Sequence, residues 1–254
     1  MDMERVFCKP DTLNDFVLGY CPGCGHGTST RLIAEVIEEM GVRQRTVAII
    51  GSGCYGNSRQ AFDFSVVHAL HGRAPAVATG LKRTHPNLVV FTLQGDGDFA
   101  AIGTADAIHA GMRGEKFTTI FLNNANFGMT GGQWAPTTLP GQKTTTTPKG
   151  HDPLMWGFPS RMTEMMALAD GTAYVARVAI NNPQNVNRAK RAIRRAFEVQ
   201  MQGLGYSIVE ILTPCPSGWR LKPLESLRWM EEQQMQVYPL KEYKVPAEKV
   251  EKAA

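Results

Sequence analysis

The first residues with recognisable chemistry in this sequence are two polar motifs. Gly95-Asp96-Gly97 places a carboxylate between two glycines, and Asn123-Asn124 follows, with its second asparagine 28 positions after Asp96. A carboxylate, an amide oxygen and a nearby backbone carbonyl form the oxygen-only ligand set that suits Mg²⁺, which completes its octahedron with water and phosphate oxygens. Glycines let the backbone approach a diphosphate closely. These residues indicate a magnesium–diphosphate site, against the alternative of an ordinary turn and a chance pair of asparagines.

Four of the five cysteines form a second candidate ligand set. Cys21 and Cys24 lie in YCPGCGHG, Cys54 lies in GSGCYG, and Cys215 lies in TPCPSGW. A two-residue spacing lets two thiolates reach one metal centre, and four thiolates suit either tetrahedral Zn²⁺ or an iron–sulfur cluster. A redox-active dithiol at Cys21 and Cys24 is a third option, although no helix is expected to begin between them. The cysteines alone leave these options open, and Cys8 lies outside the pattern.

The elements predicted from the hydrophobic pattern would bring Asp96 and Asn124 together. Apolar runs at 88–93 and 117–122 are typical of buried strands, and apolar residues at three- and four-residue steps predict a helix over 99–112. Strand, helix and strand in this order form a βαβ unit with a parallel sheet. The carboxyl ends of such strands lie at one edge of the sheet, where ligands bind. The two polar motifs should therefore face one point.

The same pattern continues on both sides of this unit. A helix over 28–40 precedes a buried strand at 46–50. Near the other end, a helix that begins at Asn182-Pro183 and runs to about residue 202 lies between apolar runs at 173–179 and 206–212. We therefore expect an α/β protein with a doubly wound, mostly parallel sheet.

Length and composition limit the class of protein. With 254 residues, 43% apolar and 20% charged, the chain suits one domain, expected over 1–221 and followed by a polar tail over 222–254 that wraps a neighbour or is loose. The net charge of +4 is mild, and no apolar stretch is long enough for a membrane span, so we expect no nucleic-acid or membrane partner. The acidic start does not resemble a signal peptide, which favours a cytoplasmic protein. The Gly-, Pro- and Thr-rich segment 128–160 is expected to be an interface or a cap over the site.

Taken together, the motifs resemble a known family. The spacing of Asp96 and Asn124 resembles the thiamine diphosphate motif of thiamine-dependent enzymes, and CPGCGHG, GSGCYG, HGRAPAVATGLK and TPCP accompany it. From about residue 19 to about residue 220, this arrangement resembles the β subunit of the 2-oxoacid:ferredoxin oxidoreductases. The segment NNANFGMTGGQWAPTTLPGQKTTTTP is similar to members that act on branched-chain 2-oxoacids or 2-oxoglutarate.

This resemblance implies a set of cofactors and ligands. Asp96, the side chain of Asn124 and the backbone carbonyl of Asn126 would hold the Mg²⁺ that anchors thiamine diphosphate. One [4Fe–4S] cluster would be held by Cys21, Cys24, Cys54 and Cys215, with Cys8 as a bystander. The implied cofactor-binding residues are Ser52, Gly53, Cys54, Tyr55, His71, Gly95, Asp96, Gly97, Asn124, Gly128, Met129 and Thr130. The histidines interpreted as structural are His26, His68, His109 and His151.

The resemblance also implies a reaction. It is the coenzyme A-dependent oxidative decarboxylation of a 2-oxoacid, of the 2-oxoglutarate or 2-ketoisovalerate type, to acyl-CoA and CO₂, with electrons passed to ferredoxin and reversible in principle. No catalytic side chain is assigned on this chain, because the glutamate that activates thiamine diphosphate is expected on a partner α subunit. The other partners that the resemblance implies are ferredoxin and, as candidates, γ and δ subunits of the same enzyme. Two alternatives stay open: a non-redox thiamine diphosphate decarboxylase or carboligase subunit with zinc on the cysteines, and a structural zinc protein that binds no cofactor.

Overall fold

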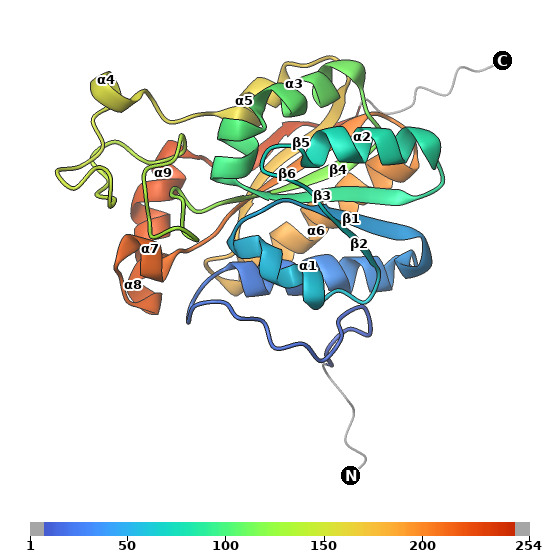
Figure 1. The fold of residues 1–254 in the computed structure, drawn as a ribbon, viewed down its shortest axis with the longest axis horizontal. Coiled ribbons are helices and arrows are strands. Elements are labelled where there is room, and N and C mark those ends of the chain that lie inside the picture. The colour runs from blue at the N-terminus through green and yellow to red at the C-terminus, as the bar shows by residue number, and fades with distance from the viewer. Residues whose placement is uncertain (1–7, 247–254) are drawn as a thin grey trace, which may run out of the picture.

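The computed structural model describes residues 8–246 and contains one seven-stranded sheet (Figure 1). Its strands are β1 (Thr46–Ile50), β2 (Ser65–His68), β3 (Val89–Gly95), β4 (Thr118–Asn123), β5 (Thr172–Ala179), β6 (Tyr206–Leu212) and β7 (Lys241–Lys244). They lie in the order β2-β1-β3-β4-β6-β5-β7, and all neighbours are parallel except β7, which is antiparallel to β5. The mostly parallel α/β sheet predicted from the sequence is confirmed.

Helices cover both faces of the sheet, as doubly wound topology requires. On one face lie α1 (His26–Glu39) and α6 (Pro183–Met201), and on the other lie α2 (Ala74–Thr84), α3 (Thr104–Arg113) and α5 (Met162–Ala167) (Figure 1). Each layer buries its own apolar cluster, one around Phe91 and Phe197 and the other around Phe99 and Phe121. Removing this surface from water is the main force that holds the layers together. Within residues 8–246, no helix has the length and apolar character needed to cross a membrane.

Most predicted elements lie within two residues of their observed bounds, but the helix predicted over 99–112 is interrupted. The first part is a single turn of π-helix, η3 (Asp98–Ile102). The backbone N–H of Gly103 closes this turn by donating to the carbonyl of Asp98 at 2.8 Å, and α3 begins after it. A Cβ on Gly103 would lie 2.7 Å from that carbonyl, so glycine permits the turn. The other short helices are η1 (Arg43–Arg45), η2 (Cys54–Gln60), α4 (Pro153–Trp156), α7 (Pro216–Trp219), α8 (Pro223–Trp229), η4 (Met230–Gln234) and α9 (Met235–Val237).

The structure describes residues 222–246 of the predicted tail, which pack on the domain, whereas residues 247–254 of that tail lie outside the described residues. Residues 223–244 form α8, η4, α9 and β7, which pack beside α7 and then join the sheet next to β5 (Figure 1). Met230 and Tyr238 are fully buried, and the hydroxyl of Tyr238 donates to the carbonyl of Thr137 at 3.0 Å. The segment is polar in composition because only a few, widely spaced side chains face inward. Those few side chains anchor it to the domain.

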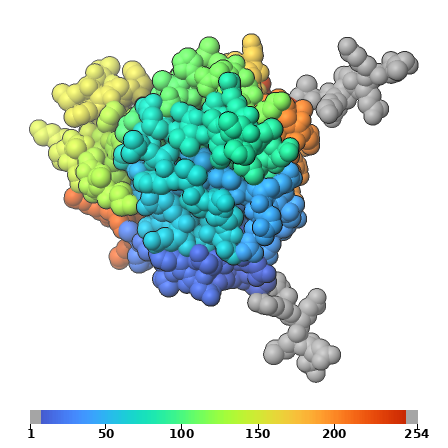
Figure 2. Space-filling view, turned by 45° about the vertical axis from the view of Figure 1, so that its right-hand side comes forward, coloured from blue at the N-terminus to red at the C-terminus, as the bar shows by residue number. Residues whose placement is uncertain are grey.

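Residues 127–161 contain only the short helix α4, in agreement with their lack of periodicity. Side chains hold much of this segment in place: for example, Nδ1 of the buried His151 lies 3.1 Å from the carbonyl oxygen of Leu139. The part around α4 projects from the body of the molecule (Figures 1 and 2). The strongly exposed apolar side chains there are Leu154, Met155 and Phe158.

Candidate functional site

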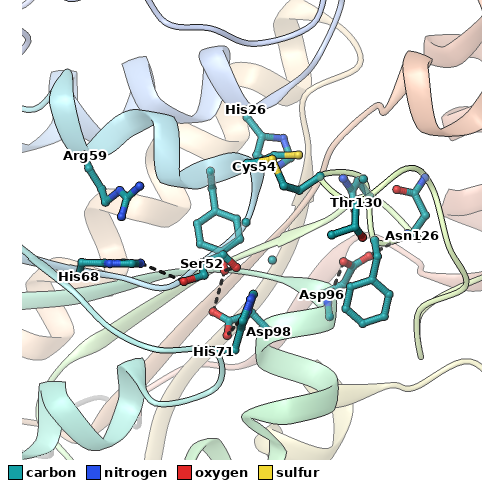
Figure 3. Close-up of a pocket in the computed structure, with 18 residues that line it drawn as sticks. His26, Ser52, Cys54, Arg59, His68, His71, Asp96, Asp98, Asn126 and Thr130 are labelled. Carbon is teal, nitrogen blue, oxygen red and sulfur yellow. Dashed lines mark hydrogen bonds and ion pairs between the residues drawn. The ribbon is translucent and has the colours of Figure 1, made fainter.

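A cleft of about 320 Å³ lies at the carboxyl edge of the sheet (Figure 3). The residues that line it are His26, Ser52, Gly53, Cys54, Tyr55, Arg59, His68, His71, Gly95, Asp96, Gly97, Asp98, Asn124, Asn126, Phe127, Gly128, Met129 and Thr130. All the cofactor-binding residues implied by the sequence therefore line one cleft, although their roles stay predictions. The lining residues to which the sequence analysis gave no binding role are His26, Arg59, His68, Asp98 and Phe127, and it interpreted the two histidines as structural.

Three oxygens of the predicted magnesium site meet in this cleft. The side-chain oxygen of Asn124 lies 2.8 Å from the backbone oxygen of Asn126 and 3.2 Å from Oδ2 of Asp96. None of these atoms is a donor, so without a cation the amide of Asn124 would gain two hydrogen bonds by turning its nitrogen toward them. With a cation, the oxygen is correctly placed: neighbouring ligands of octahedral Mg²⁺ lie about 2.9 Å apart, because each is roughly 2.05 Å from the ion. Both separations from the Asn124 oxygen are those of neighbouring ligands of one magnesium ion.

Asp96 is buried and is held by several hydrogen bonds. Its Oδ1 accepts from the backbone N–H of Gly97 at 2.8 Å, and its Oδ2 accepts from the backbone N–H of Asn126 at 3.1 Å and from the hydroxyl of Thr137 at 2.8 Å. Burial raises the pKa of Asp96 to about 6, although the hydrogen bonds favour the ionised form. A buried carboxylate gains more from a nearby cation than an exposed one does. The electrostatics of Asp96 therefore agree with a metal-binding role.

Two glycines are needed where aromatic rings approach the loop after β3. A Cβ on Gly97 would lie 1.9 Å from the ring of Phe127, and a Cβ on Gly95 would lie 2.9 Å from the ring of Tyr55. Both rings line the cleft. A side chain at either glycine would displace a ring. The two glycines of GDG therefore also allow the rings of Phe127 and Tyr55 to line the cleft at close range.

Asp98 is a candidate that the sequence analysis missed, although the second aspartate of GDGD was a visible signal. Its buried carboxylate accepts from the hydroxyl of Tyr55 at 2.8 Å, from the amide of Gln94 at 3.2 Å and from the backbone N–H of Gly72. Nδ1 of His71 lies 3.9 Å from its Oδ1 (Figure 3). Burial raises the pKa of Asp98. Asp98 thus ties together the turn after β1, the loop after β2 and the end of β3.

The remaining predicted residues lie around the mouth of the cleft. The hydroxyl of Ser52 is 2.9 Å from Nε2 of His68, a histidine to which the sequence analysis gave no functional role. The hydroxyl of Thr130 donates to the side chain of Gln133 at 2.7 Å, which fixes the loop after Gly128. Met129 is 58% exposed.

The four motif cysteines gather beside the cleft. Burial, together with the nearby thiols of Cys215, Cys54 and Cys21, raises the pKa of Cys24 to about 12. Burial, with Cys215 and Cys21, likewise raises the pKa of Cys54 to about 11. Burial also raises the pKa of Cys215, and Cys21 adds to this rise. Every pair of the four thiols therefore interacts, which places them around one region. Cys8 is exposed and is not among the thiols that shift these pKa values.

Comparison with known proteins agrees with this geometry. The model of the family described as thiamine pyrophosphate enzyme, C-terminal TPP binding domain, matches residues 41–211. The chain is 41% identical over 251 residues to a ketoisovalerate oxidoreductase subunit VorA of Methanothermobacter thermautotrophicus, covering 95% of this chain and 53% of that protein. It is 39% identical over 213 residues to a 2-oxoglutarate synthase subunit KorB of Archaeoglobus fulgidus, covering 84% of this chain and 75% of that protein.

A solved structure shares the fold. It is the 2-oxoglutarate:ferredoxin oxidoreductase of Magnetococcus marinus with 2-oxoglutarate, coenzyme A and succinyl-CoA bound. It matches with a TM-score of 0.74 and 27% identity, covering 87% of this chain and 72% of that chain.

Fold and cleft together define a thiamine pyrophosphate-binding domain. The chain belongs to the family of the thiamine pyrophosphate-binding subunits of 2-oxoacid:ferredoxin oxidoreductases. It spans about half the length of the ketoisovalerate oxidoreductase subunits that it matches.

Proposed function

We propose that this chain is the subunit of a 2-oxoacid:ferredoxin oxidoreductase that binds thiamine diphosphate, Mg²⁺ and one [4Fe–4S] cluster. The whole enzyme would convert a 2-oxoacid of the 2-oxoglutarate or 2-ketoisovalerate type and coenzyme A to acyl-CoA and CO₂, with electrons passed to ferredoxin. One observation carries the proposal: an oxygen trio suited to Mg²⁺ and four interacting cysteines border the same cleft, with Cys54 in its wall. A cytoplasmic location goes with it, since free thiols of this kind persist in a reducing compartment.

The residues of the cleft suit a metal-anchored diphosphate. Asp96, Asn124 and the carbonyl of Asn126 would hold the ion, and its remaining positions would accept phosphate oxygens and water. Asp98 would keep Tyr55 and His71 in place beside the ligand. Bound thiamine diphosphate supplies a nucleophilic carbon for the 2-oxo carbonyl and an electron sink for the loss of CO₂.

The four cysteines suit a metal centre. Thiols whose pKa values are raised to about 12 at Cys24 and about 11 at Cys54 stay protonated near neutral pH unless a metal replaces the proton. Both zinc and a [4Fe–4S] cluster accept four thiolates. The family to which the chain belongs favours the cluster, because its members are oxidoreductases that take ferredoxin as partner.

A partner subunit would complete the site. Among the described residues that line the cleft there is no glutamate, so we infer that the carboxylate which activates thiamine diphosphate comes from an α subunit. The projecting segment around α4 offers a surface for it, because a monomer rarely exposes apolar side chains in a group. These side chains are Leu154, Met155 and Phe158. The enzyme would then be a hetero-oligomer, with γ and δ subunits as further candidates.

The test is the reaction itself, without oxygen, on the chain co-purified with its partner subunits. We expect reduction of ferredoxin that requires coenzyme A and one of the two 2-oxoacid types, no activity from the isolated chain, and none from the Asp96→Ala complex. Comparing 2-oxoglutarate with 2-ketoisovalerate identifies the substrate. Release of CO₂ and an aldehyde without any reduction of ferredoxin would contradict the proposal and support the non-redox alternative.

A further inference from the structure

The side-chain amide of Asn126 is buried beside the thiol of Cys215. Asn126 is 1% exposed, and within the described part of the chain neither its Nδ2 nor its Oδ1 makes a hydrogen bond of good geometry, although the amide lies within reach of the Cys215 thiol. Most buried polar atoms in folded proteins are paired, so this amide is free to bond sulfur or another group on the Cys215 side.

A cysteine sulfur borders the same space as this amide. A Cβ on Gly218 would lie 2.6 Å from Nδ2 of Asn126 and 2.8 Å from Sγ of Cys215. A Cβ on Gly128 would lie 3.3 Å from Oδ1 of Asn126 and 3.3 Å from the same sulfur. Two glycines therefore keep open a small space that the amide and the sulfur share, and a larger residue at either position would fill it.

The main chain of Asn126 belongs to the magnesium site. Its N–H donates to Oδ2 of Asp96 at 3.1 Å, and its carbonyl oxygen is one of the three that face each other there. In Figure 3, Asn126 and Asp96 lie at the same end of the cleft. One residue thus contacts the proposed metal site with its backbone and lies beside Cys215 with its side chain.

We propose that Nδ2 of Asn126 donates a hydrogen bond to sulfur on the Cys215 side of the [4Fe–4S] cluster and thereby raises the reduction potential of that cluster. This inference rests on the proposed function, because it requires the cluster. Hydrogen bonds to cluster sulfurs help to set the potential, and they stabilise the more negative, reduced state more than the oxidised one. Asn126 would then make the cluster a better electron acceptor right beside the thiamine site.

The experiment uses the full chain, purified without oxygen together with its partner subunits. Asn126→Leu keeps a similar shape without the N–H, and Asn126→Ala serves as a second variant that only removes atoms. Thr137→Val is the matched control, because it removes a different hydrogen bond to Asp96 at a buried position. Iron and sulfide are measured for each protein, and the midpoint potential is then obtained by redox titration followed with electron paramagnetic resonance.

We expect both Asn126 variants to retain iron and to favour the reduced cluster about tenfold less, which is a fall of about 59 mV for a one-electron couple. The potential of Thr137→Val should not change. If the reduction equilibrium of an iron-loaded Asn126 variant stays within about twofold of the unaltered enzyme, the amide binds something other than the cluster and the proposal is wrong. Loss of iron from both Asn126 variants, with iron retained by Thr137→Val, would also overturn the proposal. Asn126 would then be needed for assembly of the cluster and not for its potential. Absence of iron from the unaltered enzyme would instead contradict the proposed function, and the inference with it.

Discussion

The side-chain oxygen of Asn124 faces Oδ2 of Asp96 across 3.2 Å, with no donor between them. Asp96 directly follows β3 and Asn124 directly follows β4, and these strands are parallel neighbours, so the sheet itself sets the approach of the two oxygens. An acceptor facing an acceptor is unfavourable unless a cation lies between them. This contact is the observation that supports the proposal of a metal-anchored diphosphate in the cleft.

Magnesium binding should weaken as the pH falls through about 6. Asp96 must be ionised to hold the ion, and burial raises its pKa to about 6, so below that pH a proton competes with the metal. We expect the affinity for Mg²⁺ in the presence of thiamine diphosphate to fall about tenfold per pH unit below 6 and to level off above it. Titration calorimetry on the complex measures this, with Asp96→Asn as a weakly binding reference. A constant affinity from neutral to acidic pH would exclude Asp96 as a ligand.

Gly97→Ala should be destabilising, whereas Gly80→Ala should not. A Cβ on Gly97 would lie 1.9 Å from the ring of Phe127, and such overpacking typically costs about 1–3 kcal/mol. Gly80 lies within α2 and a Cβ there would meet nothing within 4 Å, so alanine should stabilise the chain by roughly 0.5–1 kcal/mol. Urea unfolding gives both free energies of unfolding. Equal effects of the two substitutions would show that Phe127 yields freely and does not wall the cleft.

Trp219→Phe should weaken the magnesium site from outside the cleft. Nε1 of Trp219 donates to the backbone carbonyl of Asn124 at 2.9 Å, and removing this donor leaves a buried acceptor unpaired, at a cost of roughly 1–3 kcal/mol. Trp229, which packs against Trp219 with ring centroids 4.3 Å apart, provides the control Trp229→Phe. We expect weaker binding of Mg²⁺ and thiamine diphosphate only for Trp219→Phe. The reverse order of the two variants would mean that ring packing, not the hydrogen bond, positions Asn124.

Arg177→Met should strongly destabilise the fold. The fully buried guanidinium of Arg177 donates to Glu210 at 2.6 Å and to Glu164 at 2.5 Å, so its loss leaves the buried carboxylate of Glu210 without a counter-charge, at a cost of about 3–5 kcal/mol. Glu210→Gln in the same chain should recover part of that loss. Breaking the surface pair of Arg73 and Asp106 by Arg73→Ala should change the free energy of unfolding by at most about 1 kcal/mol. Denaturant unfolding that ranks the two arginines equally would contradict this reading of the buried network.

The approach of Asp96 to Asn124 could be predicted from the sequence, because the two strands of a βαβ unit end at the same edge of the sheet. Once 88–93 and 117–122 are taken as neighbouring parallel strands, Asp96 and Asn124 must come to the same edge. The cysteines required the family resemblance, since spacing alone did not distinguish a cluster from zinc. The structure brings the four thiols within electrostatic reach of one another, which no local pattern could show.

Other features depend on contacts between distant parts of the chain. Residues 223–244 are held against the domain by a few buried side chains such as Tyr238. The amino-acid composition of this segment does not show which of its side chains are buried. Asp98 is adjacent to the motif, but its role becomes visible only through Tyr55 and Gly72, which follow β1 and β2. The strand β2 is short and exposed, so its sequence lacks the apolar run that identified the others.

The central claim is that one cleft joins a thiamine diphosphate site to an iron–sulfur cluster, and iron analysis tests it most directly. The chain and its partner subunits are purified without oxygen, and iron, sulfide and visible absorption are measured before and after dithionite. Cys54→Ser is compared with Cys8→Ser, which lies outside the ligand set. We predict about four irons and four sulfides assigned to this chain, a visible band bleached by dithionite, and loss of both from Cys54→Ser alone. Zinc in place of iron, or equal iron in the two variants, would contradict the account.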